Sequence, residues 1–328
     1  MNNYRIFGSE MSPYSVKVRA YFSYKKIPYD WIVRSPKNQT EFNKLAVLPL
    51  IPLVVGPSGN IMQDSTPIIE ELEVNFPVPS IYPESPELYF LSALIEEYGD
   101  EWANKLMFHA RWWHDVDQAS AARILGINLA DNLNLSLESR SNEVRQRMVG
   151  RREFVGSSGE NAPLIEQFLH VLLTTLENHL ENRKYLFGAR PSFGDFGLAP
   201  QIYELSSDPT GGGILRSRAS NTLAWAYRML EPSDEGTFEG WHTLAPTLVP
   251  LLENIGELFL PWSDANAAAL GKKQSIFTVD LNGQSYQQRP QKYHAKSLAV
   301  LKDKLRGLTK RDNLDQILED ANCLRWLI

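Results

Sequence analysis

The first eighty residues alternate short apolar runs with amphipathic stretches. The runs that favour strands lie at 4–7, 29–33, 51–55 and 61–63, and the stretches with helical spacing lie at 13–26 and 66–75. The turn signal Pro-Ser-Gly-Asn separates the last two strands, and Pro77 closes the second helix. A β-α-β order followed by a hairpin and a helix predicts a small α/β unit over residues 1–80.

From about residue 86 onward, the apolar positions recur almost throughout with the period of a helix. In the segment 163–181, for example, a leucine-rich stripe follows one helical face. The exception lies near 276–287, where β-forming residues flank Asn282-Gly283, a strong signal for a hairpin. We therefore predict an all-helical second domain over 86–328, with a β-hairpin insert near 276–287 and a helical extension after it.

Length and composition fit two globular domains. The chain has 328 residues, of which 43% are hydrophobic and 22% charged, enough to bury a large core. A net charge of −6 argues against a general nucleic-acid binder, and no apolar run is long enough to predict a membrane span. Cys323 is the single cysteine, so no intrachain disulfide can form. With an N-terminus unlike a signal peptide, these features predict a cytoplasmic protein.

The step Ser12-Pro13 joins the first predicted strand to the first predicted helix. Ser12 can cap this helix with its side-chain oxygen, and Pro13 suits the first helical position. The free amide hydrogens at the helix start point toward a bound anion. This elbow is therefore suited to stabilising a thiolate or a phosphate. Two alternatives stay open, namely Ser12 as a helix cap alone and Tyr14 as the hydroxyl donor.

Three other local features accompany this elbow. Pro52 begins an apolar strand, so it requires either an edge position or a cis peptide bond. Asp64-Ser65 ends a strand and opens a helix, where the pair suits either a polar site or a simple N-cap. Far downstream, Ser192 and Asp195 have the spacing of a capping box, which predicts a structural role for both.

Together these features resemble a cytosolic glutathione transferase, a family with a thioredoxin-like N-terminal domain followed by an all-helical C-terminal domain. The segment 12–19, Ser-Pro-Tyr-Ser-Val-Lys-Val-Arg, resembles the active-site segment of the omega and tau classes in its serine form. The resemblance implies that Ser12 is the catalytic residue and meets the glutathione sulfur. The residues it implies for glutathione binding are Ser12, Tyr14, Ile51, Pro52, Asp64 and Ser65.

Within this set the resemblance gives each pair a role. Ile51-Pro52 resembles the family's cis-proline step, whose backbone pairs with the cysteinyl part of glutathione. Asp64-Ser65 resembles the Glu-Ser pair that holds the γ-glutamyl end. Leu50 departs from the family, because many members carry a basic residue there that contacts the glycyl carboxylate.

The resemblance implies an enzyme that conjugates the glutathione thiolate to a small apolar electrophile, acting as a homodimer in detoxification. Glutathione is the expected co-substrate, and no metal is expected, since His109 and His114 are spaced so that their side chains point apart on a helix. The electrophile is expected against an aromatic wall made of Phe108, Trp112 and Trp113. An ordinary core role for these aromatic residues stays open.

Two other functions stay open at this stage. A glutathione-dependent reductase or lyase is disfavoured because a cysteine would be expected in place of Ser12. A non-catalytic binding module with the transferase fold is favoured by Leu50 and by the extra segments around 133–161 and after about 275.

Overall fold

The computed structural model describes residues 3–129 and 135–328. Its N-terminal part holds a mixed four-stranded sheet in the order β2-β1-β3-β4. The elements of this part are β1 (Tyr4–Gly8), α1 (Pro13–Tyr24), β2 (Tyr29–Val33), η1 (Pro36–Asn38), α2 (Gln39–Leu45), β3 (Leu53–Val55), β4 (Ile61–Gln63) and α3 (Ser65–Asn75). β1 pairs parallel with β2 and antiparallel with β3, which in turn pairs antiparallel with β4. The predicted thioredoxin-like α/β unit is confirmed.

The rest of the described chain is helical apart from a hairpin, as the sequence predicts. The helices are α4 (Pro86–Tyr98), η2 (Gly99–Ala103), α5 (Asn104–Trp113), α6 (Asp115–Asn128), α7 (Leu137–Val149), η3 (Glu153–Val155), α8 (Ala162–Leu180), α9 (Phe193–Ser206), α10 (Pro209–Arg218), α11 (Ser220–Arg228), α12 (Trp241–Asn254), η4 (Ile255–Phe259), α13 (Leu260–Gly271), α14 (Lys292–Arg306), α15 (Asp312–Asp320) and α16 (Leu324–Leu327). The hairpin pairs β5 (Phe277–Leu281) with β6 (Gln284–Gln288) around Asn282 and Gly283, which both have positive φ. None of the described helices is long and apolar enough to span a membrane.

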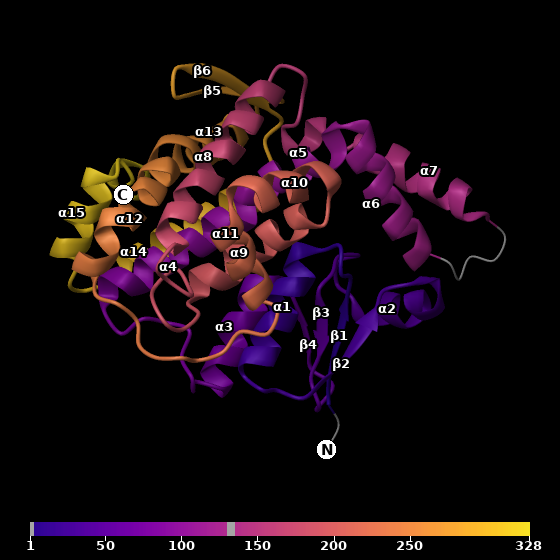
Figure 1. Cartoon of the computed structure of the whole chain (residues 1–328), viewed down its shortest axis with the longest axis horizontal. Helices are drawn as coiled ribbons and strands as arrows, with labels where there is room; N and C mark the ends of the chain where they lie inside the picture. The colour runs from indigo at the N-terminus through magenta and orange to yellow at the C-terminus, as the bar shows by residue number, and fades with distance from the viewer. Residues whose placement is uncertain (1–2, 130–134) are drawn as a thin grey trace.

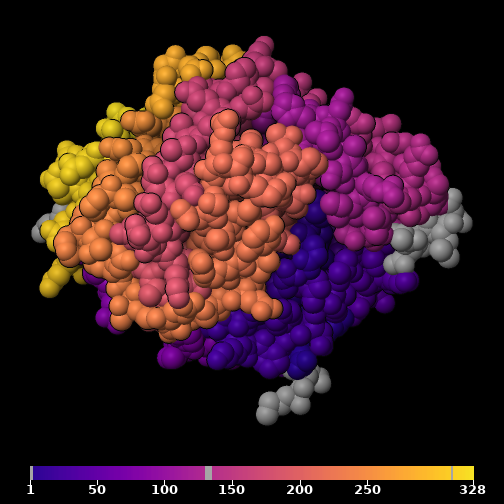
Figure 2. Space-filling model, viewed as in Figure 1, coloured from indigo at the N-terminus to yellow at the C-terminus, as the bar shows by residue number. Residues whose placement is uncertain are grey.

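The helical part covers one side of the N-terminal sheet (Figures 1 and 2). In Figure 1 the indigo sheet lies below the helices, and the paired α6 and α7 extend over the side where α2 lies. The C-terminal helices, drawn in yellow, lie at the opposite end of the molecule. The predicted insert around 133–161 begins at residues 133 and 134, which lie outside the described residues.

Helix α9 is the centre of the contact between the two parts. It is buried over nearly its whole length and packs against both α1 and α4. A Cβ on Gly197 would lie 2.6 Å from the Glu96 backbone, so only glycine permits this close approach of α9 to α4. Ser192 and Asp195 form a capping box at its start, and the other Asp195 oxygen accepts a hydrogen bond from the Trp225 indole at 2.8 Å. Both residues therefore fix the start of the central helix.

A buried ion-pair network joins the same two parts beside α9. Lys17 of α1 is 0% exposed, and its ammonium pairs with Glu96 and, at 2.6 Å, with Asp100. The same ammonium donates to the Thr66 hydroxyl of α3 at 3.0 Å. Two carboxylates and a hydroxyl hold the Lys17 proton so firmly that its pKa is raised, although burial alone would lower that pKa. The network thus fixes α1, α3, α4 and η2 relative to one another.

We expect Lys17→Met to destabilise the protein by about 3–5 kcal/mol, because it leaves two buried carboxylates without a counter-charge. The measurement is urea unfolding followed by circular dichroism. Lys184→Met is the matched control, since Lys184 pairs with Glu235 while 53% of its side chain is exposed; its loss should stay below about 1 kcal/mol. Equal losses in the two variants would contradict a special role for the buried network.

Candidate functional site

A cavity of about 610 Å³ lies where the loop before β3, together with β4 and α3, faces η2, α5 and α14. Its wall on the N-terminal side includes Tyr14, Val47, Leu48, Leu50, Ile51, Pro52, Ile61, Gln63, Asp64, Ser65 and Pro67. Its wall on the helical side includes Glu101, Asn104, Lys105, Val155, Gln291, Tyr293, His294 and Lys296. The structure therefore brings Tyr14, Ile51, Pro52, Asp64 and Ser65 together around one cavity.

Ser12 lies at the start of α1, two residues before Tyr14. Its backbone is extended, and its side-chain oxygen accepts the Ser15 amide hydrogen at 3.3 Å, so it caps the helix. A hydroxyl that accepts in this way still has its own hydrogen to donate. Pro13 lacks an amide hydrogen, and among the described residues no group accepts the Tyr14 amide hydrogen. The elbow can therefore act as a cap and offer donors to an anion at once.

The Tyr14 hydroxyl is already engaged. It donates its hydrogen to the Asp100 carbonyl oxygen at 2.8 Å. Burial, together with Glu101 and Asp100, raises the pKa of this phenol well above its usual value, so the proton stays on the oxygen. Tyr14 thereby ties α1 to η2. The hydroxyls of this segment with a hydrogen still to donate are those of Ser12 and of the buried Ser15.

The peptide bond between Ile51 and Pro52 is cis, which settles one of the two alternatives that the sequence leaves open. The preceding loop is held by Gln63, the last residue of β4. Its side-chain oxygen accepts the amide hydrogens of Val47 and Leu48 at 2.8 and 3.0 Å, and its nitrogen donates to the carbonyls of Leu48 and Leu50 at 2.9 Å each. Sequence analysis gave Gln63 no role; its place directly before Asp64 is the signal that points to it.

Asp64 and Ser65 do not follow the simple N-cap pattern. Asp64 precedes α3 with a φ of 78°, a conformation that aspartate tolerates better than most residues. Its side chain makes no cap hydrogen bond and instead accepts from the Tyr293 hydroxyl at 2.8 Å. The Ser65 hydroxyl is buried and lies 3.4 Å from Asp100. Because Tyr293 uses one oxygen of Asp64, the other stays available to a ligand.

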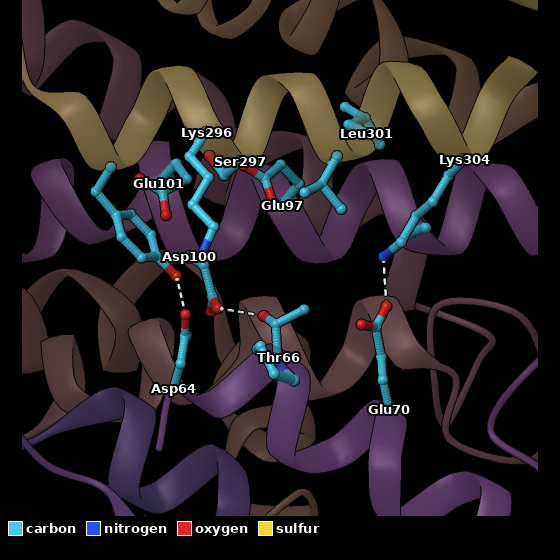
Figure 3. Close-up of a pocket in the computed structure, with 14 residues that line it drawn as sticks. Asp64, Thr66, Glu70, Glu97, Asp100, Glu101, Lys296, Ser297, Leu301 and Lys304 are labelled. Atoms are coloured by element: carbon cyan, nitrogen blue, oxygen red, sulfur yellow. Dashed lines mark hydrogen bonds and ion pairs between the residues drawn. The ribbon is translucent and has the colours of Figure 1, made fainter. Parts of the chain in front are cut away.

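Helix α14 brings Tyr293 to this place from the far C-terminal region of the chain. Figure 3 shows α14 lying along α4 above the start of α3, with Asp64, Thr66 and Glu70 reaching toward it. Lys304 pairs with Glu70 at 2.6 Å, so both ends of α14 contact α3 or the residue before it. No local pattern in the sequence indicates these contacts, since the partners are more than 200 residues apart.

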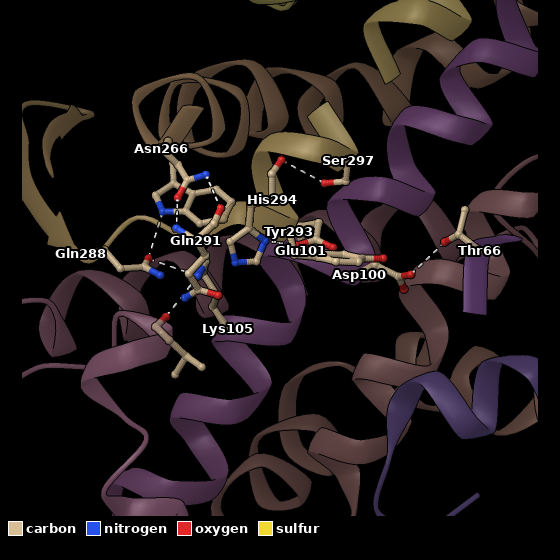
Figure 4. Close-up of polar contacts among 12 residues, drawn as sticks. Thr66, Asp100, Glu101, Lys105, Asn266, Gln288, Gln291, Tyr293, His294 and Ser297 are labelled. Atoms are coloured by element: carbon tan, nitrogen blue, oxygen red, sulfur yellow. Dashed lines mark hydrogen bonds and ion pairs between the residues drawn. The ribbon is translucent and has the colours of Figure 1, made fainter. Parts of the chain in front are cut away.

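The helical wall of the cavity is polar. Figure 4 shows Lys105 and His294 beside Gln288, Gln291 and Glu101. The Lys105 ammonium donates to the Val155 carbonyl and the Gln288 amide oxygen at 3.2 Å each, and it lies 4.2 Å from the Trp262 ring centre. Burial lowers the pKa of Lys105 to about 7. Sequence analysis missed Lys105 and His294, since neither belongs to a recognisable motif.

The aromatic residues expected to hold an electrophile are placed elsewhere. Trp112 is 1% exposed and packs with Ala121, Ala122 and Val144 in a small core beneath α6 and α7. Phe108 packs against the same core, as does Met11, the residue before Ser12. Trp113 stacks on His109 at a ring distance of 4.9 Å. Phe108 and Trp112 thus share a small core with Met11, the residue before Ser12, and none of the three aromatic residues lines the 610 Å³ cavity.

Comparison with known proteins identifies the N-terminal part. Residues 11–74 match the family described as glutathione S-transferase, N-terminal domain, which confirms the resemblance to the cytosolic glutathione transferase superfamily. A search of curated proteins gave no match. Among the described residues, no cluster of His, Cys, Asp or Glu side chains could hold a metal ion.

Several solved structures are similar to this chain at low identity and low TM-score. A glutathione S-transferase of Methylobacterium radiotolerans in complex with glutathione sulfonate is 20% identical, with 75% of this chain and 94% of that chain covered and a TM-score of 0.42. The beta-etherase LigF of a Sphingobium species is 16% identical, with 70% and 95% covered and a TM-score of 0.48. The tau class glutathione S-transferase of mango is 16% identical, with 74% and 96% covered and a TM-score of 0.43. Because these TM-scores are low, the family assignment depends on the match over residues 11–74.

We expect Gln63→Ala to loosen the loop over 46–50, because the amides of Val47 and Leu48 lose the oxygen that accepts their hydrogens. At about 1 kcal/mol net for each hydrogen bond, amide exchange in this loop should become about tenfold faster or more. Hydrogen exchange followed by mass spectrometry measures this change. Gln316→Ala, which alters an exposed glutamine of α15, is the control. Unchanged exchange in the loop of the Gln63 variant would contradict the assignment.

Proposed function

We propose that this chain, a member of the glutathione transferase superfamily through its N-terminal domain, binds glutathione in the 610 Å³ cavity and transfers its thiolate to a small electrophile. One observation carries the proposal. Residues 11–74 match the family's N-terminal domain, and five residues that the resemblance implies for glutathione binding line one cavity, while Ser12 does not line it and lies two residues before Tyr14, which does. The proposed domains are residues 1–80 for glutathione and 86–328 for the second substrate.

Each part of the site has a proposed role. Ser12 donates its hydroxyl hydrogen to the glutathione sulfur. The cis step Ile51-Pro52 presents backbone groups to the cysteinyl part, and the free oxygen of Asp64 receives the γ-glutamyl ammonium. Ser65 and the amides at the start of α3 receive the γ-glutamyl carboxylate, since a helix start favours anions. Tyr14 contributes by fixing α1 against η2.

The electrostatics of this arrangement suit thiol activation without a general base. A free thiol has a pKa of about 8.5, and lowering it by about 2 units takes about 2.7 kcal/mol. A hydrogen bond from Ser12 to a charged sulfur contributes about 1.5–3 kcal/mol, and the start of α1 contributes about 0.3–1 kcal/mol. The sum reaches the requirement. The thiolate then attacks the electrophilic carbon, a carbon–sulfur bond forms, and the bond to the leaving group breaks with its electron pair.

A non-catalytic binding module is the second candidate, and two observations favour it. Tyr293 already occupies one oxygen of Asp64, and Leu50 offers no charge to the glycyl carboxylate of glutathione. A reductase or lyase lacks such support, because Ser12 cannot form a mixed disulfide. Homodimerisation, a cytoplasmic location and a role in detoxification accompany the transferase proposal as implications of the resemblance.

We expect Ser12→Ala to lower the turnover of glutathione with 1-chloro-2,4-dinitrobenzene at least tenfold, since the thiolate loses its hydroxyl donor. Tyr14→Phe should lower turnover much less, because its hydroxyl hydrogen already goes to the Asp100 carbonyl. Steady-state kinetics measures both, and thermal unfolding checks that each variant keeps its fold.

The outcomes separate the candidates. Full activity in Ser12→Ala with a loss in Tyr14→Phe would assign the sulfur to Tyr14 instead. If calorimetry detects glutathione binding but no conjugation occurs with the wild-type protein, the binding module is the function. No heat at millimolar glutathione would exclude both.

A further inference from the structure

The two walls of the cavity differ in chemical character. Most residues on the N-terminal wall away from the Asp64-Ser65 end are aliphatic, with Val47, Leu48, Leu50 and Ile61 at the mouth. Across from them, the helical wall presents two amides, a carboxylate, a phenol, an imidazole and two ammonium groups, with Val155 as an aliphatic member. Several of these groups already bond within the protein, as His294 does with Glu101 and Tyr293 with Asp64. A purely apolar electrophile would still offer no counter-charge to a buried ammonium on this wall, and burying a charge without a counter-charge is costly.

Lys105 stands out among the buried lysines of the described chain. Lys17 has Glu96 and Asp100 as counter-charges, and Lys25 pairs with Glu73 at 2.6 Å. Lys105 is 4% exposed, yet no ion pair of Lys105 is found among the described residues. Its partners are the neutral oxygens of Val155 and Gln288.

The nearest acid on the cavity wall does not fill this gap. Glu101 lies in η2, one turn before Lys105, and opposes the fall in the Lys105 pKa, but its carboxylate is hydrogen-bonded to the His294 imidazole and forms no ion pair with Lys105. An ammonium has three hydrogens to donate, and Val155 and Gln288 accept two from Lys105. The ammonium also lies 4.2 Å from the centre of the Trp262 ring, so its close contacts are all with neutral groups at the place where Lys105 borders the cavity.

We infer that the second substrate carries a carboxylate, which pairs with the Lys105 ammonium on the helical wall of the cavity. The inference rests on the proposed transfer reaction and narrows its electrophile to a molecule with an apolar body and an acid group. The N-terminal wall holds the residues proposed for glutathione, so the groups across the cavity are left to face the second substrate. Lys105 is then a specificity-determining residue and takes no part in thiol activation.

The test uses a matched pair of electrophiles, 4-chloro-3-nitrobenzoate and its methyl ester. With each, the glutathione thiolate forms a bond to the ring carbon that carries chlorine, and chloride leaves with the electron pair. Each kcat/KM is divided by the rate constant of the uncatalysed reaction, which removes the difference in intrinsic reactivity. The wild-type protein should prefer the acid, because only the acid offers a counter-charge to Lys105.

Lys105→Met removes the charge while keeping a side chain of similar length. Since a hydrogen bond to a charged group corresponds to about 10- to 100-fold in binding, kcat/KM for the acid should fall by that factor, and kcat/KM for the ester should change less than about threefold. The unchanged ester reaction also shows that the variant folds. Lys292→Met is the control: Lys292 is exposed at the start of α14 and does not line the cavity.

The pH dependence of the preference for the acid distinguishes a binding role of Lys105 from a purely structural one, since a structural role would leave that preference independent of pH. The preference for the acid over the ester should decline as pH rises above about 7, where Lys105 loses its proton. Thiol ionisation affects both substrates equally and cancels in the ratio. The charged and titratable groups nearest Lys105 are Glu101 of η2 and His294 of α14, and Lys105→Met keeps both, so its ratio should no longer follow pH in this range.

Three results would overturn the inference. Equal losses with both substrates would make Lys105 a structural residue. No loss with the acid would leave the transferase proposal standing without this subsite. A raised KM for glutathione with both substrates would assign Lys105 to the glycyl carboxylate of glutathione. If the wild-type protein turns over neither substrate and binds no glutathione, the proposed function itself fails.

Discussion

The candidate site depends on one buried cation. Lys17 lies on α1, one turn after the Ser12 elbow, and its ammonium contacts Glu96, Asp100 and Thr66. Because charges buried without partners cost several kcal/mol, α1, α3 and η2 cannot separate without exposing or unpairing these groups. The relative positions of Ser12, Ser65 and the helical wall follow from this constraint.

Asp100 belongs to the buried network of Lys17 and also contacts two residues proposed for the glutathione site, Ser65 and Tyr14. One of its carboxylate oxygens accepts from Lys17 and lies near the Ser65 hydroxyl, and its backbone carbonyl accepts from Tyr14. Three residues of the N-terminal unit therefore converge on a single residue of η2. Asp100 lies in the π-helical turn η2, a rare geometry that is found frequently at functional sites.

Local signals in the sequence were sufficient for most of the N-terminal unit, although they did not predict η1 and α2 between β2 and β3. The strand and helix order, the unusual Pro52 and the Ser12 elbow depend on neighbouring residues, and the structure contains each of them. The side chains on the far wall could not be predicted in this way. Tyr293 meets Asp64 across 229 positions, and this contact depends on the path of the C-terminal segment around the whole helical part. Trp112 was expected to line a pocket but lies in a small core, because helical spacing alone does not distinguish a core residue from one that lines a pocket.

Helix α14 links the two ends of the cavity through consecutive residues. Tyr293 contacts Asp64 at the end proposed for the γ-glutamyl group, and His294 binds Glu101 on the wall where Lys105 lies. Neighbouring residues of a helix point about 100° apart, so a single turn can serve two different parts of one site. A shift of this turn would alter two contacts at once: the hydrogen bond from Tyr293 to Asp64 and the contact of His294 with Glu101, the carboxylate near Lys105. The C-terminal segment thereby couples the proposed glutathione site to the wall that faces the second substrate.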